Sequence, residues 1–160
     1  MPDHFDLWHK FKQFNMNLLN TVSSIMTPNP ICVDINDSLT VVDRIFKENR
    51  IHHLPVISSG KLVGMLSKSD FLFFRHGFSN DQSKLEDEVR MNNFSAKDIM
   101  TKRLAKLEPN DKINVALEVF NENLFHAIPI VDNDKIIGIV STFDIIKKLA
   151  IDAEASATYD

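Results

Sequence analysis

Apolar residues along this chain follow two different periods, which together predict helices that alternate with short buried strands. Apolar residues spaced by three or four positions predict helices over residues 38–49 and 112–123. Short continuous apolar runs predict buried strands at 53–57, 62–66, 127–131 and 136–140. Briefer extended pieces are predicted at 31–33 and 105–107, and further helices are predicted to begin at Lys68 and Thr142. The pattern therefore predicts an α/β (α+β) fold.

This pattern of elements occurs twice, at a constant offset of 74 residues. When residues 25–72 are placed on residues 99–146 without a gap, 15 of the 48 positions are identical. Nearly half of the other pairs exchange one apolar residue for another. Units of about 50–60 residues are small for independent folding. We therefore expect the two halves to pack on each other about a pseudo-two-fold axis.

The repeat divides the chain into five segments. We predict an N-terminal helix in 1–20, a first repeat in 21–76, a linker in 77–94, a second repeat in 95–150 and a tail in 151–160. Asp37 and Asp111 are predicted to be the N-caps of the first helix in each repeat. Residues 58–60 and 132–134 are predicted hairpin turns. The polar linker is expected to hold a connecting helix or a loop, and the small, acidic tail is expected to fray.

The predicted N-terminal helix, from Phe5 to Asn20, lies outside the repeat and is rich in aromatic residues. Its apolar positions recur at helical spacing, with Trp8 beside them: Leu7, Phe11, Phe14 and Leu18. One interpretation is that this helix packs on the core of its own chain. The other is a dimer contact or a site for another protein, because a small two-unit domain has limited surface with which to cover so many aromatic side chains.

Composition narrows the possible functions. The 160 residues carry a net charge of −4 and a sequence pI of about 5.8, so no basic surface points to nucleic acid. No apolar run reaches the roughly 18 residues of a membrane span, and the N-terminus lacks the apolar stretch of a signal peptide. Cys32 is the only cysteine, so a disulfide framework is excluded and a cytoplasmic location is expected. Neither a phosphate-binding loop, a zinc motif nor a nucleophile elbow occurs, and we therefore predict that the protein is not an enzyme.

A Ser-x-x-Asp pair follows the last predicted strand of each repeat: Ser67 with Asp70, and Ser141 with Asp144. One interpretation is a capping box, in which the serine caps the following helix and the aspartate bonds back to it. The other is a ligand site, because the free N–H groups at a helix N-terminus suit an anion such as phosphate. Gly64 and Gly138 lie inside the preceding strands, where glycine weakens a sheet unless something approaches closely. These glycines favour the ligand site.

Three motifs occur in both halves: Ile-Met-Thr before the first strand, His-x-x-Pro into the second strand, and an apolar strand with Gly-x-x-Ser-x-x-Asp leading into the last helix. In this order they resemble a tandem pair of CBS domains, known as a Bateman module, over residues 21–76 and 95–150. The resemblance implies two β-α-β-β-α CBS repeats packed through their sheets by pseudo-two-fold symmetry, with two clefts between them. In that family the clefts bind adenosine-containing ligands, the modules often pair into disc-like dimers, and the protein usually regulates an enzyme or a transporter.

The resemblance also implies roles for individual residues. Asp70 and Asp144 would accept hydrogen bonds from the ribose hydroxyls, which a carboxylate with two acceptor oxygens does well. The serines would contact the ribose or a phosphate, the histidine of His-x-x-Pro would contact a phosphate, and the threonine of Ile-Met-Thr would line the cleft. His53 stands where the family often has arginine, but Ala127 matches it in the second repeat, so the two sites are expected to differ. The implied nucleotide-binding set is Thr27, His52, His53, Ser67, Asp70, Thr101, His126, Ser141 and Asp144.

Neither a metal nor a cofactor is expected at this site. His52 and His53 are adjacent at the start of a predicted strand, and successive strand side chains point to opposite faces, so they could not easily chelate one ion.

These observations predict a stand-alone regulatory protein that binds AMP, ADP, ATP or an S-adenosyl compound and responds by a change of conformation or oligomeric state. The expected partners are this ligand, a second copy in a homodimer, and a regulated enzyme or transporter, without nucleic acid or membrane. The alternative is a structural interaction module with empty clefts, which acts through dimerisation and the N-terminal aromatic helix.

Overall fold

The computed structural model describes residues 17–76, 84–122 and 125–157. The elements are the 3-10 helix η1 (Val22–Ser24), the strands β1 (Thr27–Pro28) and β2 (Val33–Asp34), the helix α2 (Leu39–Glu48), the strands β3 (His53–Ser58) and β4 (Lys61–Ser67), the helices α3 (Lys68–His76), α4 (Lys84–Asn93), α5 (Ala96–Ile99) and α6 (Ile113–Asn121), the strands β5 (Ala127–Asp132) and β6 (Lys135–Ser141), and the helix α7 (Thr142–Ala157). The α/β prediction is confirmed, and each of the four long strands begins and ends within a residue of its predicted bounds.

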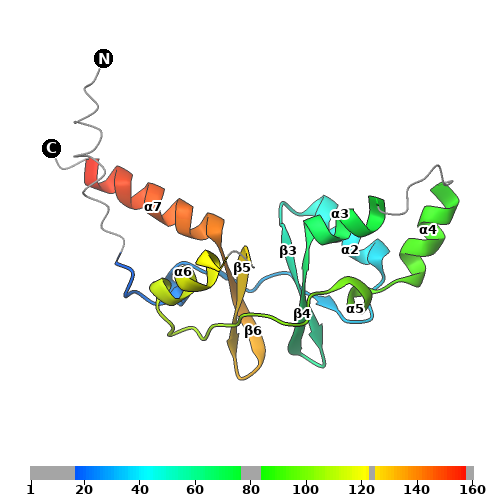
Figure 1. The fold of residues 1–160 in the computed structure, drawn as a ribbon, viewed down its shortest axis with the longest axis horizontal. Helices are drawn as coiled ribbons and strands as arrows, with labels where there is room; N and C mark the ends of the chain where they lie inside the picture. Colours follow the sequence, from blue (N-terminus) through cyan, green and yellow to red (C-terminus); the bar gives the residue numbers. More distant parts are fainter. Residues whose placement is uncertain (1–16, 77–83, 123–124, 158–160) are drawn as a thin grey trace, which may run out of the picture.

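Two three-stranded sheets lie side by side at the centre of the molecule, with helices on their outer sides (Figure 1). One has the order β2-β3-β4, with β2 parallel to β3 and β4 antiparallel to it. The other has the order β1-β6-β5 and is antiparallel throughout. Strands β4 and β6 contact each other, so the sheets pack through these two strands.

Both predicted hairpin turns are confirmed. The two central residues of each turn have positive φ angles: 49° and 77° at Ser59 and Gly60, and 49° and 64° at Asn133 and Asp134. Two consecutive residues in this region give a turn whose twist matches that of the flanking strands.

The segment that begins each repeat packs in the opposite half of the molecule. Strand β1 belongs to the first repeat, but it pairs with β6 of the second, with Thr27 opposite Ile139. Conversely, Thr101 of the second repeat forms a bridge with Met65 in β4. The two hydrophobic cores follow the same exchange, because Ala96 completes the core of the first half and Val22 completes that of the second. The two halves are therefore interlocked, as expected for units too small to bury a core alone.

This exchange accounts for the two strand glycines. A Cβ atom added to Gly64 would overlap Met100 Sδ and lie 2.9 Å from Met100 Cγ, and one added to Gly138 would overlap Met26 Sδ and lie 2.9 Å from Met26 Cγ. Each glycine thus makes room for a methionine of the opposite half. The predicted close approach occurs, but a side chain of the protein makes it, so these glycines do not support a ligand site.

The predicted N-caps Asp37 and Asp111 are wrong by one residue, since Ser38 and Lys112 occupy the N-cap positions of α2 and α6. The Asp37 carboxylate accepts a hydrogen bond from the backbone N–H of Asp34 at 2.8 Å. The Asp111 carboxylate accepts one from the N–H of Glu108 at 2.7 Å. Each aspartate therefore closes the turn before its helix, a role that aspartate also fills well.

The two ends of the chain differ in part from the expectations. The helix predicted from Phe5 to Asn20 lies outside the described residues except for its last four. These form a turn, in which Asn17 Oδ1 accepts a hydrogen bond from Leu19 N–H at 3.0 Å and Asn17 O accepts one from Asn20 N–H at 2.9 Å. The tail is not frayed where it begins, because α7 continues to Ala157. Among the described residues, no helix is both long enough and apolar enough to cross a membrane.

Candidate functional site

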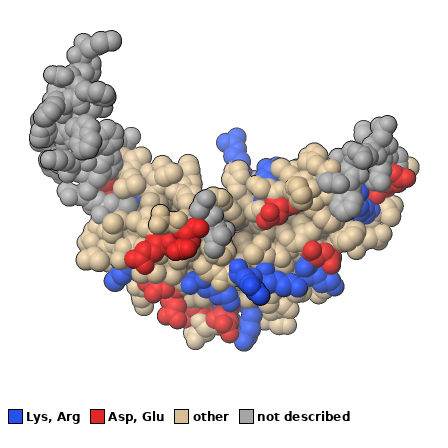
Figure 2. Space-filling model, viewed as in Figure 1, with Lys and Arg blue, Asp and Glu red and all other residues tan. Residues whose placement is uncertain are grey.

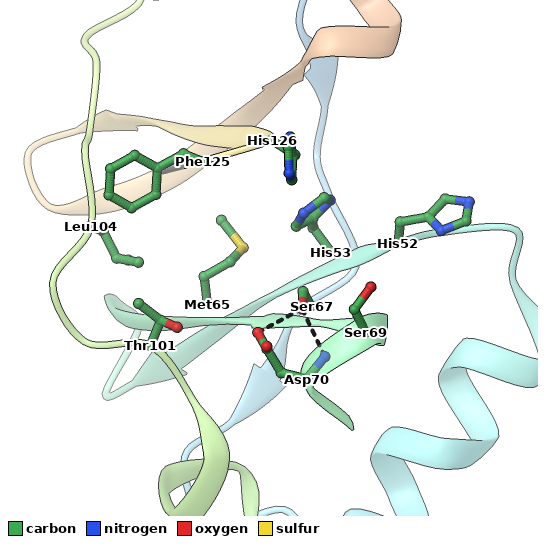
Figure 3. Close-up of a pocket in the computed structure, with 10 residues that line it drawn as sticks. All are labelled: His52, His53, Met65, Ser67, Ser69, Asp70, Thr101, Leu104, Phe125 and His126. Carbon is green, nitrogen blue, oxygen red and sulfur yellow. Dashed lines mark hydrogen bonds between the residues drawn. The ribbon is translucent and has the colours of Figure 1, made fainter. Parts of the chain in front are cut away.

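A cavity of about 510 Å³ lies between the two repeats, where β4 meets the start of α3 (Figure 3). Six of the nine predicted site residues line it: His52, His53, Ser67, Asp70, Thr101 and His126. The remaining lining residues are Met65, Ser69, Leu104 and Phe125. Thr27, Ser141 and Asp144 do not line this cavity. The structure thus brings the predicted site of the first repeat together with residues of the second.

The Ser67–Asp70 pair combines the two interpretations given above. Ser67 Oγ donates a hydrogen bond to Asp70 Oδ2 at 2.6 Å and accepts one from the N–H of Asp70 at 3.0 Å, so the serine does cap α3. Asp70 Oδ1 accepts no hydrogen bond from the described residues. One carboxylate oxygen at the cavity is therefore left for a ligand, and a carboxylate oxygen accepts hydrogen bonds from hydroxyl groups.

The equivalent pair in the second repeat is held more completely by its own helix. Asp144 Oδ2 accepts hydrogen bonds from both the N–H of Ser141 at 2.7 Å and Ser141 Oγ at 2.6 Å. This is the reciprocal geometry of a capping box. The N–H of Asp144 donates in return to Ser141 Oγ at 3.2 Å, so this pair makes one hydrogen bond more than Ser67 and Asp70 do, although Asp144 Oδ1 likewise accepts none from the described residues.

Thr101 is positioned by the exchange of segments between the halves. The N–H of Met65 donates to Thr101 O at 3.0 Å, and the N–H of Thr101 donates to Met65 O at 2.9 Å. On the preceding residue, the Met100 side chain lies over Gly64. Both contacts fix the segment against β4, so the threonine of one repeat stands in the cavity of the other. Thr27 has the corresponding place in the other half, opposite Ile139.

Three histidines lie on the same side of the cavity. Figure 3 shows His53 and His126 close together above Ser67, with His52 farther out. The pKa of His53 is lowered, chiefly by burial and then by the neighbouring His126 and His52, whereas Asp70 acts in the opposite direction. The usual histidine pKa is 6.5, so the His53 imidazole is mainly neutral at pH 7.

We expected the side chains of His52 and His53 to point to opposite faces, and this is wrong, because both residues line the cavity. The reason is that β3 begins at His53, so His52 precedes the strand and does not follow its alternation. Even so, no group of three or more histidine, cysteine, aspartate or glutamate side chains in the described part of the chain is placed to hold a metal ion.

No lysine or arginine is among the described residues that line the cavity. Figure 2 shows basic side chains gathered lower on the molecule, over the segment that connects α5 to α6. Arg75, which the sequence places on the helix after the motif, pairs with Asp43 at 3.2 Å instead. Histidine is therefore the residue type that could supply positive charge to a ligand in the cavity.

Sequence reasoning missed Met65, Ser69, Leu104 and Phe125, although all four line the cavity. Phe125 directly precedes the His-x-x-Pro motif, and Leu104 follows Ile-Met-Thr by three residues. Their place next to motif residues was the available signal. Met65 is only 6% exposed, so most of its side chain belongs to the core.

A family model described as the CBS domain matches residues 22–77 and again residues 96–151. The chain belongs to the CBS domain family. The uncharacterized protein MJ1426 of Methanocaldococcus jannaschii is 28% identical over 163 residues, which cover 84% of this chain and 97% of that protein. The chain spans only 36% and 47% of the length of two longer relatives from the same organism.

Solved structures share the fold of this CBS pair. The structure of CBSX2 in complex with AMP has a TM-score of 0.68 at 24% identity, and the match covers 82% of this chain and 97% of that one. The CBS domain pair of protein MJ0100, in complex with 5′-methylthioadenosine and S-adenosyl-L-methionine, has a TM-score of 0.65 at 22% identity, with 82% and 97% covered. At these identities the likeness shows the fold alone.

The second CBS repeat differs at the positions that correspond to the cavity. At the repeat offset, Ala127 replaces His53, Phe143 replaces Ser69 and Pro30 replaces Leu104. Phe143 is 69% exposed. An imidazole and a hydroxyl are thus lost on that side.

Proposed function

We propose that this CBS pair binds an adenosine-containing ligand in the cavity between its repeats. The observation that carries the proposal is the Asp70 carboxylate, which keeps one oxygen without a protein partner among the described residues at a cavity lined by both repeats. AMP, ADP, ATP and S-adenosyl compounds share the adenosine that such a site would recognise. The crystal structures of CBSX2 with AMP and of MJ0100 with S-adenosyl-L-methionine support this ligand class.

The chemistry of the lining supports an adenine nucleotide in one orientation. Leu104 and Phe125 form an apolar wall at one side of the cavity (Figure 3), which suits the adenine ring. Asp70 and Ser67 would bind the ribose hydroxyls, because a carboxylate accepts from two donors. The histidines on the other side would face a phosphate, to which an imidazole N–H can donate a hydrogen bond.

The proposed response to the ligand is a change in the packing of the two halves against each other. A ligand in the cavity would touch Asp70 of the first repeat and both Thr101 and His126 of the second. It can favour one arrangement only by its difference in affinity for the two arrangements. We propose that this shift regulates an enzyme or a transporter, directly or through a homodimer, and that the CBS pair itself performs no catalysis.

The test is calorimetric titration with AMP, ADP, ATP and S-adenosylmethionine, for the native protein and for Asp70→Asn. Hydrogen bonds to a charged group contribute about 1.5–3 kcal/mol, so Asp70→Asn should weaken binding about 10- to 100-fold. The amide keeps the size of the side chain, so a loss of affinity would report the lost charge.

The matched control is Asp98→Asn. Ser95 and Asp98 form the same Ser-x-x-Asp capping box at α5, with the Asp98 carboxylate accepting from Ser95 N–H and Oγ, both at 2.8 Å, but neither residue lines the cavity. Asp98→Asn should weaken the helix cap without lowering the affinity for the ligand. Equal losses of affinity in both variants, or unchanged affinity in Asp70→Asn, would contradict the proposed site.

A second candidate is an interaction module without a ligand. The observation in its favour is the exposure of Phe73 on α3, at 81%, and of Phe143 on α7, at 69%. A contiguous exposed apolar patch marks a site of protein contact, and this candidate requires that these aromatic side chains belong to such patches. A titration panel that gives no heat, from a protein that still dimerises, would select this candidate.

A further inference from the structure

The chain enters the second half in the same way that α4 enters the first. The N–H of Leu39 donates to Phe94 O at 2.9 Å, directly after α4. At the repeat offset, the N–H of Ile113 donates to Asn20 O at 3.0 Å. The isolated bridges repeat as well, since Ser38 pairs with Ser95 and Lys112 pairs with Thr21. Residues 10–19 are therefore the repeat counterpart of α4, and of these only 17–19 lie among the described residues.

Helix α4 covers α2 and lies beside α3 in the first half (Figure 1). Met91 anchors it, because this side chain is 7% exposed and belongs to the core of that half. Thr40 Oγ1 of α2 also donates to Asn92 Oδ1 at 2.8 Å. The groove that these three helices share is polar, with Asp43 paired to Arg75 at 3.2 Å.

The corresponding face of the second half is apolar. Leu117 on α6 takes the place of Asp43, and Leu149 on α7 takes the place of Arg75. Both leucines are half-buried and pack against the core of the second half. The cover that this face requires is therefore apolar, whereas α4 presents Asp87 and Glu88 to its own groove.

A buried polar atom lies at the same face. Asn114 of α6 is the counterpart of Thr40, and its backbone N–H donates to Leu18 O at 3.1 Å. Its side-chain oxygen Oδ1 is buried and accepts no hydrogen bond from the described residues. Buried polar atoms in folded proteins nearly always have a partner. A donor from the preceding part of the chain would supply it.

We propose that residues 5–16 of the same chain cover the face of α6 and α7 formed by Asn114, Leu117 and Leu149. The segment ends where the described chain begins, at Asn17, which is already held against α6 through Leu18 and Asn20. Twelve residues in a helix span about 18 Å, close to the length of the ten-residue α4. The segment also carries apolar side chains that can cover this apolar face, including Phe11 and Phe14.

The side chain that anchors residues 5–16 cannot be the counterpart of Met91, which anchors α4. Asn17 occupies the position of Met91, but it is exposed and lies in a turn. An apolar anchor must therefore come from an earlier residue, and the stripe that contains Phe11 and Phe14 provides it. This placement resolves the two interpretations of the N-terminal segment in favour of a contact within its own chain.

Trp8 makes the proposal directly testable, because it is the only tryptophan in the chain. Its emission and its quenching by acrylamide should report a side chain shielded from water, unchanged when the protein is diluted 100-fold. Phe14→Asp should shift the emission to that of a fully hydrated tryptophan. Asn15→Asp adds the same charge at a neighbouring polar position and should leave the emission unchanged.

Amide hydrogen exchange locates the contact. Phe14→Asp should accelerate exchange in α6 and α7 by about tenfold, since burial of a phenylalanine side chain is worth at least that factor in a local opening equilibrium. Exchange in α2 and α3 should not change. Hydrated Trp8 emission in the native protein would overturn the proposal, and so would unchanged exchange in α6. An emission that follows dilution would overturn it in favour of a contact with a second copy.

Discussion

Replacement of Gly64 by alanine tests whether one contact supports both the fold and the proposed site. The added Cβ would overlap Met100 Sδ and lie 2.9 Å from Cγ and 3.2 Å from Cβ of the same residue. Movement of the flexible sulfur end cannot relieve all three contacts, so the segment at Met100 must shift. Excess volume in a packed core costs about 1–3 kcal/mol. In a domain of this size, each 1 kcal/mol lowers Tm by about 2–4 °C.

The same variant should lower the affinity for the ligand. Thr101 follows Met100 and is held to β4 by its two backbone hydrogen bonds with Met65, so a shift at Met100 moves Thr101 in the cavity. Loss of one hydrogen bond of about 1 kcal/mol weakens binding about fivefold. Gly138→Ala is the matched control, because its Cβ would meet Met26 in the same way, at 2.9 Å from Cγ and 3.3 Å from Cβ. That contact leads to Thr27, which does not line the cavity.

Urea denaturation and calorimetric titration separate the two effects. Both glycine variants should lose a similar free energy of unfolding, but only Gly64→Ala should lose affinity. Addition of Met100→Ala to Gly64→Ala should cost about 1 kcal/mol less than the sum of the two single changes, because the clash is removed. An unchanged free energy of unfolding in Gly64→Ala would refute the packing argument. Equal losses of affinity in both glycine variants would refute the link to Thr101.

Two further predictions concern His53 and Phe73. The folded protein holds the pKa of His53 below the usual 6.5, so around that pH the unfolded chain binds more protons, and the free energy of unfolding should fall as the pH decreases through 6.5 toward the folded-state pKa. Urea denaturation at several pH values should show a weaker dependence for His53→Gln, and an identical dependence would contradict the assignment. For the proposed homodimer, Phe73→Asp should lower the sedimentation coefficient, whereas Leu85→Asp, at a site 73% exposed on α4, should not. If both or neither of these variants dissociated, α3 would not be the dimer contact.

The repeat and its strands could be predicted because local signals determine them. The sequence pattern of a buried strand bounded by turn residues is local, so it can be recognised without knowledge of the rest of the fold. The 74-residue offset recurs in the structure, in the hydrogen bonds at Leu39 and Ile113. The exchange of lead-in segments could not be predicted. An apolar lead-in such as Ile25-Met26 must be buried, but its pattern does not specify in which half. For the same reason the glycines suggested a ligand when they in fact accommodate Met26 and Met100.

The candidate site was predictable to the extent that its residues belong to motifs. Asp70 and His126 come from different repeats, and the motifs placed both at a cleft. Leu104 and Phe125 lie in irregular chain next to motifs, where neither period nor spacing indicates which way a side chain points. His52 shows the same limit, since it directly precedes β3, where strand alternation does not determine the direction of a side chain.

The exchange of segments also determines how much a ligand could change. A ligand at 100 times its Kd stabilises the state that binds it by about 2.7 kcal/mol. This is as large as the cost of about 1–3 kcal/mol expected for disturbing the contact of Gly64 with Met100. Because Thr101 lies in the cavity and Met100 beside it packs against the first core, the ligand would act on the same junction that interlocks the halves. At one ligand concentration, Gly138→Ala should therefore gain as much stability as the native protein, whereas Gly64→Ala should gain about 1 kcal/mol less because its affinity is about fivefold lower.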